Sequence, residues 1–284
     1  MENFEFYNPT HIVFGKGTRD KVGSTLKQHN GGRVLLHYGG GSIKKYGLYD
    51  AIVKQMEASG IDYVELGGVK PNPRLSLVRE GIRICREQGV DFILAVGGGS
   101  VIDSAKAIAL GVPYEGDVWD FYTGKADPET VLPVGVVLTI PAAGSEASTG
   151  SVITNEEGWL KRAHNSLLII PRFAVMDPEL SYTLPAFQTA AGAADIMAHV
   201  IERYFTNVRH VDLTDRLCES TLRTVMKYVP IALNDPENYD ARAEIMWAGT
   251  VAHNNLLNTG RIGDWASHDM EHELRGIYDG AHGA

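Results

Sequence analysis

The chain has 284 residues, of which 44% are hydrophobic and 21% charged, as in ordinary globular proteins. Its net charge of −9, without any basic run, argues against nucleic acid as a partner. The N-terminus lacks a signal-peptide pattern, no apolar run is long enough to span a membrane, and Cys85 and Cys218 lie in apolar helical patterns. We therefore expect a cytoplasmic protein with no disulfide framework and no membrane partner.

The first half of the chain alternates predicted strands and helices. This order predicts a parallel sheet with helices on both faces, and we assign residues 1–184 to an α/β domain. Asn72 is the expected cap of the second helix, with Pro73 at its first position. The expected strands are 33–38, 63–66, 91–96 and 134–138, and the expected helices are 43–59, 74–88 and 101–110.

A triple glycine, residues 97–99, follows the strand 91–96 and precedes a helix. Glycines let a ligand approach the backbone closely, and the N–H groups at a helix start attract an anion such as a pyrophosphate. A tight turn alone needs one glycine, so the run favours phosphate binding. The small-residue motifs 39–42 and 139–145 also follow strands, where ligands of parallel sheets bind. Neither glycine motif fits the G-x-G-x-x-G fingerprint, so a dinucleotide site here would be a different version of one.

Residues 185–284 are predicted to form an all-helical domain. Apolar residues recur at three- and four-residue spacing in 190–204, 213–228 and 240–257. The composition changes near Leu184, where we place the domain boundary.

Carboxylates and histidines in this second half are candidate metal ligands. Asp195 and His199 are four apart, so they project from one helix face and could share a divalent ion, although such pairs often lie on surfaces without metal. Spacing alone nominates His268 and His272 as a second pair and leaves His282 open. Of the nearby carboxylates Asp264 and Asp269, we interpret Asp264 as a helix N-terminus signal. Gly144-Ser145-Glu146 is not a G-x-S-x-G elbow, and both a plain loop and a cofactor contact remain open for it.

Taken together, these motifs resemble the iron-containing (group III) alcohol dehydrogenases. The matching segments are PTHIVFGKG from residue 9, GGGSVIDSAK from 97, TIPAAGSEAS from 139, ADIMAH from 194 and SHDMEHELRGIYDGAHG from 267. Residues 38–47 and 235–248 are similar to the NADPH-dependent butanol dehydrogenase and aldehyde reductase branch. The resemblance covers essentially the whole chain. It implies a dehydroquinate synthase-like fold, with an α/β dinucleotide-binding domain in residues 1–184 followed by an all-α metal-binding domain in residues 185–284. Family members have more helices after the segment that matches this chain, so the resemblance also implies that the helical domain is truncated at its C-terminus.

The resemblance implies a metal site between one carboxylate and three imidazoles. The matching residues are Asp195, His199, His268 and His282. His272 matches a family histidine that lies near the cofactor and is not a metal ligand. The resemblance therefore replaces the pair His268 and His272, which spacing suggested, by His268 and His282. The ligands suit Fe²⁺ or Zn²⁺ with one position open for a substrate oxygen.

The resemblance also implies a dinucleotide site along the carboxyl edge of the sheet. Asp103 matches a residue near the nicotinamide and is, with His272 as a proton relay, an expected catalytic residue. NAD-preferring members carry an aspartate where this chain has Gly39, and Ser42 with Lys44 or Lys45 could hold a 2′-phosphate, so we expect NADP(H) to be preferred over NAD(H). The implied cofactor contacts are Gly39, Gly40, Gly41, Ser42, Gly97, Gly98, Gly99, Ser100, Asp103, Thr139, Ser145 and Lys161.

The implied function is a metal-dependent alcohol dehydrogenase or aldehyde reductase that acts on small primary alcohols or aldehydes, as a homodimer. The metal polarises the carbonyl oxygen while the nicotinamide transfers hydride. One alternative is a glycerol dehydrogenase-like enzyme that oxidises polyols with NAD and zinc. Another is an inactive truncated fragment that only binds cofactor. Dehydroquinate synthase activity is disfavoured because the sequence lacks a basic cluster for a phosphorylated acid.

Overall fold

The computed structural model describes residues 1–278. Within them, six parallel strands form one sheet in the order β1-β8-β5-β4-β2-β3. The predicted parallel sheet is confirmed, and β1 and β8 are additional short strands. The strands are β1 (His11–Phe14), β2 (Arg33–Tyr38), β3 (Asp62–Leu66), β4 (Phe92–Gly97), β5 (Val134–Leu138) and β8 (Phe173–Met176).

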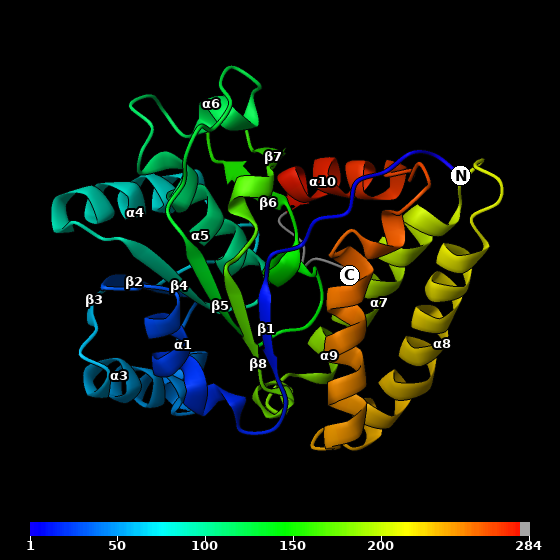
Figure 1. Ribbon diagram of the computed structural model, residues 1–284, viewed down its shortest axis with the longest axis horizontal. Coiled ribbons are helices and arrows are strands. Elements are labelled where there is room, and N and C mark those ends of the chain that lie inside the picture. The colour runs from blue at the N-terminus through cyan, green and yellow to red at the C-terminus, as the bar shows by residue number, and fades with distance from the viewer. Residues whose placement is uncertain (279–284) are drawn as a thin grey trace.

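Helices cover both faces of this sheet, as Figure 1 shows. On one face lie α4 (Leu75–Gln88) and α5 (Gly99–Gly111), and on the other lie α1 (Val22–Gln28) and α3 (Leu48–Ala58). The apolar core is divided into two clusters accordingly.

Strand β4 shows why a central strand of this sheet is apolar throughout. Phe92, Leu94 and Val96 pack into one core cluster, whereas Ile93 and Ala95 pack into the other. Alternate side chains point to opposite faces, and both faces are covered, so no position tolerates a polar residue.

Two expected helix boundaries are wrong. The helix expected at 43–59 is interrupted, because Gly47 has a φ of 76° between α2 (Ser42–Lys45) and α3. Asn72 is not the cap of α4, since it has a φ of 54° and the helix begins at Leu75, after an extended Arg74. Asn72 instead adopts the left-handed conformation that asparagine tolerates in turns, and Arg74 occupies the N-cap position.

Several short elements were not predicted from the sequence. An antiparallel hairpin pairs β6 (Gly150–Asn155) with β7 (Leu160–Asn165). The others are η1 (Thr18–Lys21), α6 (Trp119–Tyr122), η2 (Ser145–Ala147), η3 (Leu167–Ile169), η4 (Pro178–Ser181) and η5 (Leu256–Asn258).

The described chain after Pro185 is helical, which confirms the predicted α/β and helical organisation. Helices α7, α8 and α9 pack around an apolar cluster that includes Ile196, Cys218 and Ile245. The boundary at residues 184 and 185 stays a prediction, within the segment between β8 and α7. None of the helices described combines the length and apolar character needed to cross a membrane. The helices are α7 (Ala186–Tyr204), α8 (Asp212–Asn234), α9 (Tyr239–His253) and α10 (Ala266–Tyr278).

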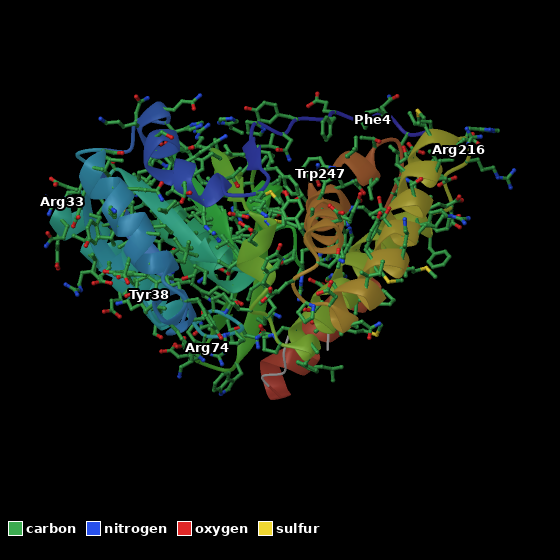
Figure 2. The ribbon with its side chains drawn as sticks, turned by 90° about the horizontal axis from the view of Figure 1, so that it is seen from below. Phe4, Arg33, Tyr38, Arg74, Arg216 and Trp247 are labelled. Atoms are coloured by element: carbon green, nitrogen blue, oxygen red, sulfur yellow. The ribbon has the colours of Figure 1, made fainter. Side chains whose placement is uncertain are left out.

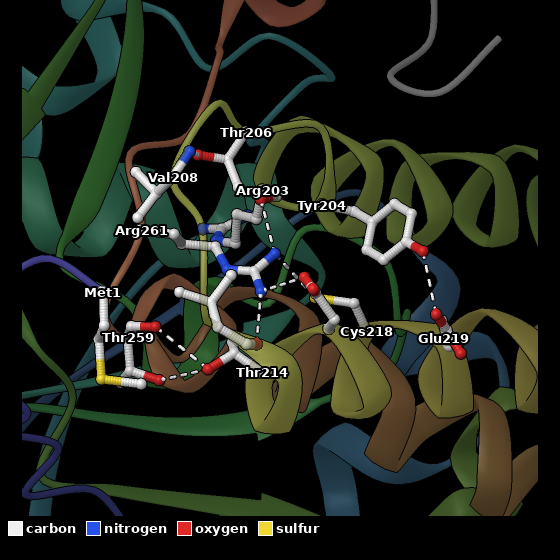
Figure 3. A network of polar contacts seen from close by, with 12 residues as sticks. Met1, Arg203, Tyr204, Thr206, Val208, Thr214, Cys218, Glu219, Thr259 and Arg261 are labelled. Atoms are coloured by element: carbon white, nitrogen blue, oxygen red, sulfur yellow. Dashed lines mark hydrogen bonds and ion pairs between the residues drawn. The ribbon is translucent and has the colours of Figure 1, made fainter.

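Long-range contacts hold α7 and the segment before α10 in place. The buried Arg261 guanidinium donates to the backbone oxygen of Arg203 at 2.9 Å and pairs with Asp215 at 2.6 Å (Figure 3). The N-terminal segment around Phe4 crosses from the sheet to the helical part (Figure 2). There the ammonium group of Met1 donates to a backbone oxygen at 2.7 Å. The end of α7 is therefore fixed by residues distant in sequence.

His37 is a fully buried histidine in β2 that makes folding stability depend on pH. Its Nδ1–H donates to the backbone oxygen of Leu66 at 2.8 Å, and its Nε2 accepts from the Ser104 hydroxyl at 2.9 Å. Burial lowers the pKa of His37 to about 4, opposed only by the bond to Leu66. The neutral ring is therefore the form that the fold stabilises.

Because the folded-state pKa lies below the unfolded one, this stability is complete above about pH 6.5 and is lost as the pH falls toward 4. We expect His37 to account for a loss of about 2 kcal/mol of unfolding free energy between pH 7 and pH 5. Denaturant titrations of the wild type and His37→Gln at both pH values measure this difference. Stabilities that fall in parallel in the two proteins would contradict it.

Candidate active site

Loops at the carboxyl ends of β2, β4 and β5 line one cavity of about 690 Å³. These ends meet because the three strands are adjacent and parallel. Of the predicted cofactor contacts, Gly41 is the one that does not line this cavity. Those that do are Gly39, Gly40, Ser42, Gly97, Gly98, Gly99, Ser100, Asp103, Thr139, Ser145 and Lys161.

The glycines of these loops serve two different purposes. A Cβ at Gly40 or Gly41 would meet no atom within 4 Å, so the backbone there borders open space. A Cβ at Gly97 would lie 2.5 Å from the Val101 side chain, and one at Gly98 would lie 2.9 Å from Ile140. Internal packing therefore explains two of the three glycines, and the premise that such a turn needs only one glycine is wrong here.

A buried polar network fixes the cavity wall between α5 and η2. Asp103 accepts hydrogen bonds from the Ser145 hydroxyl at 2.6 Å and from the backbone N–H of Val152 at 3.0 Å. The ammonium group of Lys106 donates to the Ser145 hydroxyl at 3.0 Å and to two backbone oxygens. Burial lowers the pKa of Lys106 to about 8, although nearby carboxylates oppose the shift. The two predicted contacts Asp103 and Ser145 are thus held rigidly, by a lysine that sequence reasoning missed.

Lys161 connects the hairpin to the helical part of the chain. Its side chain is 5% exposed, lies on the cavity wall and has its Nζ 3.8 Å from a carboxylate oxygen of Glu271 in α10. Both parts of the chain therefore border the same cavity.

A cluster of candidate metal ligands lies at the helical side of this cavity. Among the residues that the structure describes, Asp195, His199 and His268 place their ligand atoms within 4.8 Å of one another. Asp195 Oδ1 is 3.7 Å from His268 Nε2 and 3.4 Å from His199 Nδ1. All three residues are buried, and both histidines line the cavity. Helix α7 supplies the first two from successive turns, and the first turn of α10 supplies the third.

The chemistry of this cluster fits a divalent metal ion. His199 Nδ1–H donates to the backbone oxygen of Asp195 at 2.8 Å, which leaves Nε2 as the ring atom with a lone pair. Burial lowers the pKa of His199 to about 4, against the opposing charge of Asp195, so the ring is neutral. Carboxylate oxygen and imidazole nitrogen are common ligands of Zn²⁺ and Fe²⁺. Ligand atoms about 2.0–2.2 Å from one ion lie roughly 3–4 Å apart, as Asp195 Oδ1 and His268 Nε2 do at 3.7 Å.

Two predicted residues cannot be placed, and one secondary prediction is confirmed. His282 and the side chain of His272 lie outside the described part of the chain, so their roles as fourth ligand and proton relay stay predictions.

Asp264 marks a helix start as expected, because its Oδ1 accepts from the backbone N–H of Ala266, where α10 begins.

Glu202, Arg203 and His253 surround the cluster and were missed by sequence reasoning. The Arg203 guanidinium donates to His253 Nδ1 at 2.9 Å, and the His253 ring lies 4.4 Å from that of His199. The i, i+3 spacing of Glu202 from His199 could have indicated a shared helix face. No local pattern could have paired Arg203 with His253, which comes from another helix.

Two family models together match most of the chain. The model described as iron-containing alcohol dehydrogenase matches residues 9–178. The model described as the C-terminal part of the Fe-containing alcohol dehydrogenase family matches residues 189–284.

Individual relatives match along the whole chain. It is 49% identical over 282 residues to a probable NADH-dependent butanol dehydrogenase of Bacillus subtilis, covering 99% of this chain and 73% of the relative. It is 41% identical to the NADPH-dependent aldehyde reductase YqhD of Escherichia coli, covering 98% of this chain and 72% of that protein. A solved structure of NADH-dependent butanol dehydrogenase A from Thermotoga maritima superposes with a TM-score of 0.97 at 45% identity, covering 100% of this chain and 71% of that one.

The packing of Gly98 gives a testable difference between two loop glycines. We expect Gly98→Ala to lower the unfolding free energy by about 1–3 kcal/mol, because the added methyl group overlaps the Ile140 side chain. Gly41→Ala is the matched control and should change stability by less than about 0.5 kcal/mol, since its Cβ meets nothing within 4 Å. Chemical denaturation measures both, and equal stabilities would show that Gly98 is not required by packing.

Proposed function

The chain belongs to the iron-containing alcohol dehydrogenase family, and on this premise we propose that it transfers hydride between a nicotinamide dinucleotide and a small primary alcohol or aldehyde. The observation that carries this proposal is the single cavity bordered by the glycine loops of the sheet and by His199 and His268. A cofactor and a metal centre need such a shared space for a reaction between them. In the forward direction an aldehyde, NAD(P)H and a proton give an alcohol and NAD(P)⁺.

Asp195, His199 and His268 are the proposed metal ligands, with His282 as the fourth. One carboxylate beside neutral imidazoles suits Fe²⁺ or Zn²⁺. A bound divalent ion supplies positive charge that stabilises developing negative charge on the substrate oxygen. The protein holds the ligands in a buried position at the cavity wall, so water is largely excluded around the reacting atoms.

The glycine loops are the proposed dinucleotide site. Helix α5 begins at Gly99, so the backbone N–H groups at its start belong to the glycine segment 97–100 and favour a pyrophosphate. A bound nicotinamide supplies or accepts the hydride. Asp103 and Ser145, fixed by Lys106, orient the ring end of the cofactor in this proposal, and Lys161 contacts the nucleotide. His272 is the proposed proton relay.

We propose that NADP(H) is preferred over NAD(H), and that aldehyde reduction is the direction used. At the cavity wall, Gly39 offers no carboxylate to repel a 2′-phosphate, and Ser42 offers a hydroxyl. Lys44 is 3.4 Å from the carboxylate of Glu65, which leaves Ser42 and Lys45 as the better candidates for phosphate contact. The butanol dehydrogenases named above are NADH-dependent and the less similar aldehyde reductase is NADPH-dependent, so this proposal depends on the residues of this chain alone.

A cytoplasmic homodimer is the proposed state of the protein. The charge and cysteine pattern support the location. Strand β1 lies at an edge of the sheet and has one neighbour, β8, among the described residues. Sedimentation velocity distinguishes a dimer from a monomer.

The metal role predicts a joint loss of ion and activity. We expect Asp195→Asn and His268→Ala each to lower Fe²⁺ or Zn²⁺ affinity by more than about tenfold. Residues that only support a metal ligand already raise metal affinity by about tenfold or more, so the loss of a ligand itself should cost more. Aldehyde reduction with NADPH should fall with the metal content measured by elemental analysis. His11→Ala, an exposed change on β1, is the control. Full turnover by the metal-free variants would refute the metal role.

The cofactor preference predicts that two nearly isosteric changes at Gly39 have different effects. A Cβ at Gly39 has its nearest contact at 3.5 Å, so both Gly39→Asp and Gly39→Asn fit. We expect only the aspartate to lower the ratio of kcat/KM for NADPH to kcat/KM for NADH, by roughly tenfold, because its charge repels a 2′-phosphate. A wild type that clearly prefers NADH, or an asparagine variant that behaves like the aspartate, would overturn the proposal.

A further inference from the structure

Glu202 is a buried carboxylate beside the candidate metal cluster but on the far side of one of its histidines. Its side chain is 3% exposed, and it lies on α7, three residues after His199. Glu202 is not among the residues that form the ligand cluster in the described chain. A buried carboxylate requires hydrogen bonds or a positive partner, so its contacts indicate its role.

The Glu202 side chain accepts two hydrogen bonds from His268. Glu202 Oε1 accepts from the backbone N–H of His268 at 3.1 Å and from its ring Nδ1 at 3.1 Å. A carboxylate can only accept, so Nδ1 carries the hydrogen. This fixes the tautomer and leaves Nε2, 3.7 Å from Asp195 Oδ1, as the atom directed into the cluster.

Glu202 also fixes the backbone that carries His268. The backbone N–H of His268 belongs to the first turn of α10, where helix N–H groups have no partner within the helix and a negative charge is favourable. The backbone oxygen of Glu202 accepts from the N–H of Asp264 at 2.8 Å. One residue thus holds the segment 264–268 at both ends.

Glu202 is poorly placed to be a ligand itself. The two nitrogens of an imidazole ring point in different directions, and Glu202 occupies the Nδ1 side while the cluster lies on the Nε2 side. The arrangement is that of a carboxylate behind a metal-binding histidine, which orients the ring and increases its basicity.

We propose that Glu202 is a positioning residue of the metal centre, which orients His268 and strengthens its bond to the ion. The proposal rests on the proposed function, because it assumes that His268 binds a metal. Helix α7 then supplies three residues of the centre from one face, two as ligands and one as support for the ligand from α10. Outer carboxylates of this kind contribute about 10–100-fold to metal affinity.

The test measures Co²⁺ binding to metal-free protein, with visible absorption as the readout. The variants are Glu202→Ala, which removes both hydrogen bonds, and Glu202→Gln, whose amide oxygen can still accept them. The control is Glu219→Ala on α8, which loses a carboxylate that accepts from the Tyr204 hydroxyl at 3.0 Å, away from the cluster. Thermal unfolding is recorded for each variant, so that a folding defect is not mistaken for a weaker metal site.

We expect Co²⁺ affinity to fall by about 10–100-fold in Glu202→Ala, to fall less in Glu202→Gln and to stay unchanged in the control. The absorption bands of bound Co²⁺ should also change in Glu202→Ala, which a purely structural role would not cause. NADPH affinity, measured by fluorescence, should be unchanged.

Two negative results separate the proposals. If the wild type binds Co²⁺ and both Glu202 variants bind it within about threefold with the same spectrum, the role of Glu202 is refuted while the proposed function stands. If the wild type itself binds no Co²⁺, the proposed function fails, and the role of Glu202 fails with it. If Glu202→Ala does not fold, Glu202→Gln decides, since wild-type affinity and spectrum in that variant would exclude a role for the negative charge.

Discussion

The candidate site depends on how one face of helix α7 is placed against the carboxyl end of the parallel sheet. Asp195 and His199 project from successive turns of α7, and His199 lines the cavity that the glycine loops border. A helix repeats its face every three to four residues, so the backbone itself determines the separation of these side chains. Any shift of α7 relative to the sheet would separate the candidate metal cluster from the candidate cofactor site.

Buried cationic side chains on both sides of the cavity oppose a shift of α7 relative to the sheet. Arg261 ties the end of α7 to α8, and the Arg203 guanidinium, buried under the Trp265 ring at 4.4 Å, ties it to α9. On the other side of the cavity, Lys106 holds the wall to which Asp103 and Ser145 belong. Burying these cations is costly without hydrogen bonds, and their donors are directed mostly to backbone oxygens and to cavity residues. The polar interior therefore gives the site its rigid geometry.

The sequence predicted features that depend on local pattern and missed those that depend on contacts between distant segments. Strand β4 and the glycine loop were clear from apolar runs and spacing, and Asp195 with His199 from helical periodicity. The break at Gly47 was missed because apolar spacing continues across it. Gly98 was assigned to ligand approach, although Ile140, far along the chain, also requires it. The ligand set beyond α7 came from the family resemblance, because spacing alone favoured His272 over His282.

The central claim is that a divalent ion and a nicotinamide dinucleotide share this one cavity. Crystals grown with Zn²⁺ and NADPH, with diffraction data collected on both sides of the zinc absorption edge, test it directly. We expect an anomalous peak between Asp195, His199 and His268, with the nicotinamide ring next to it and the pyrophosphate at residues 97–100. A peak elsewhere, or a dinucleotide bound away from the glycine loops, would contradict the account.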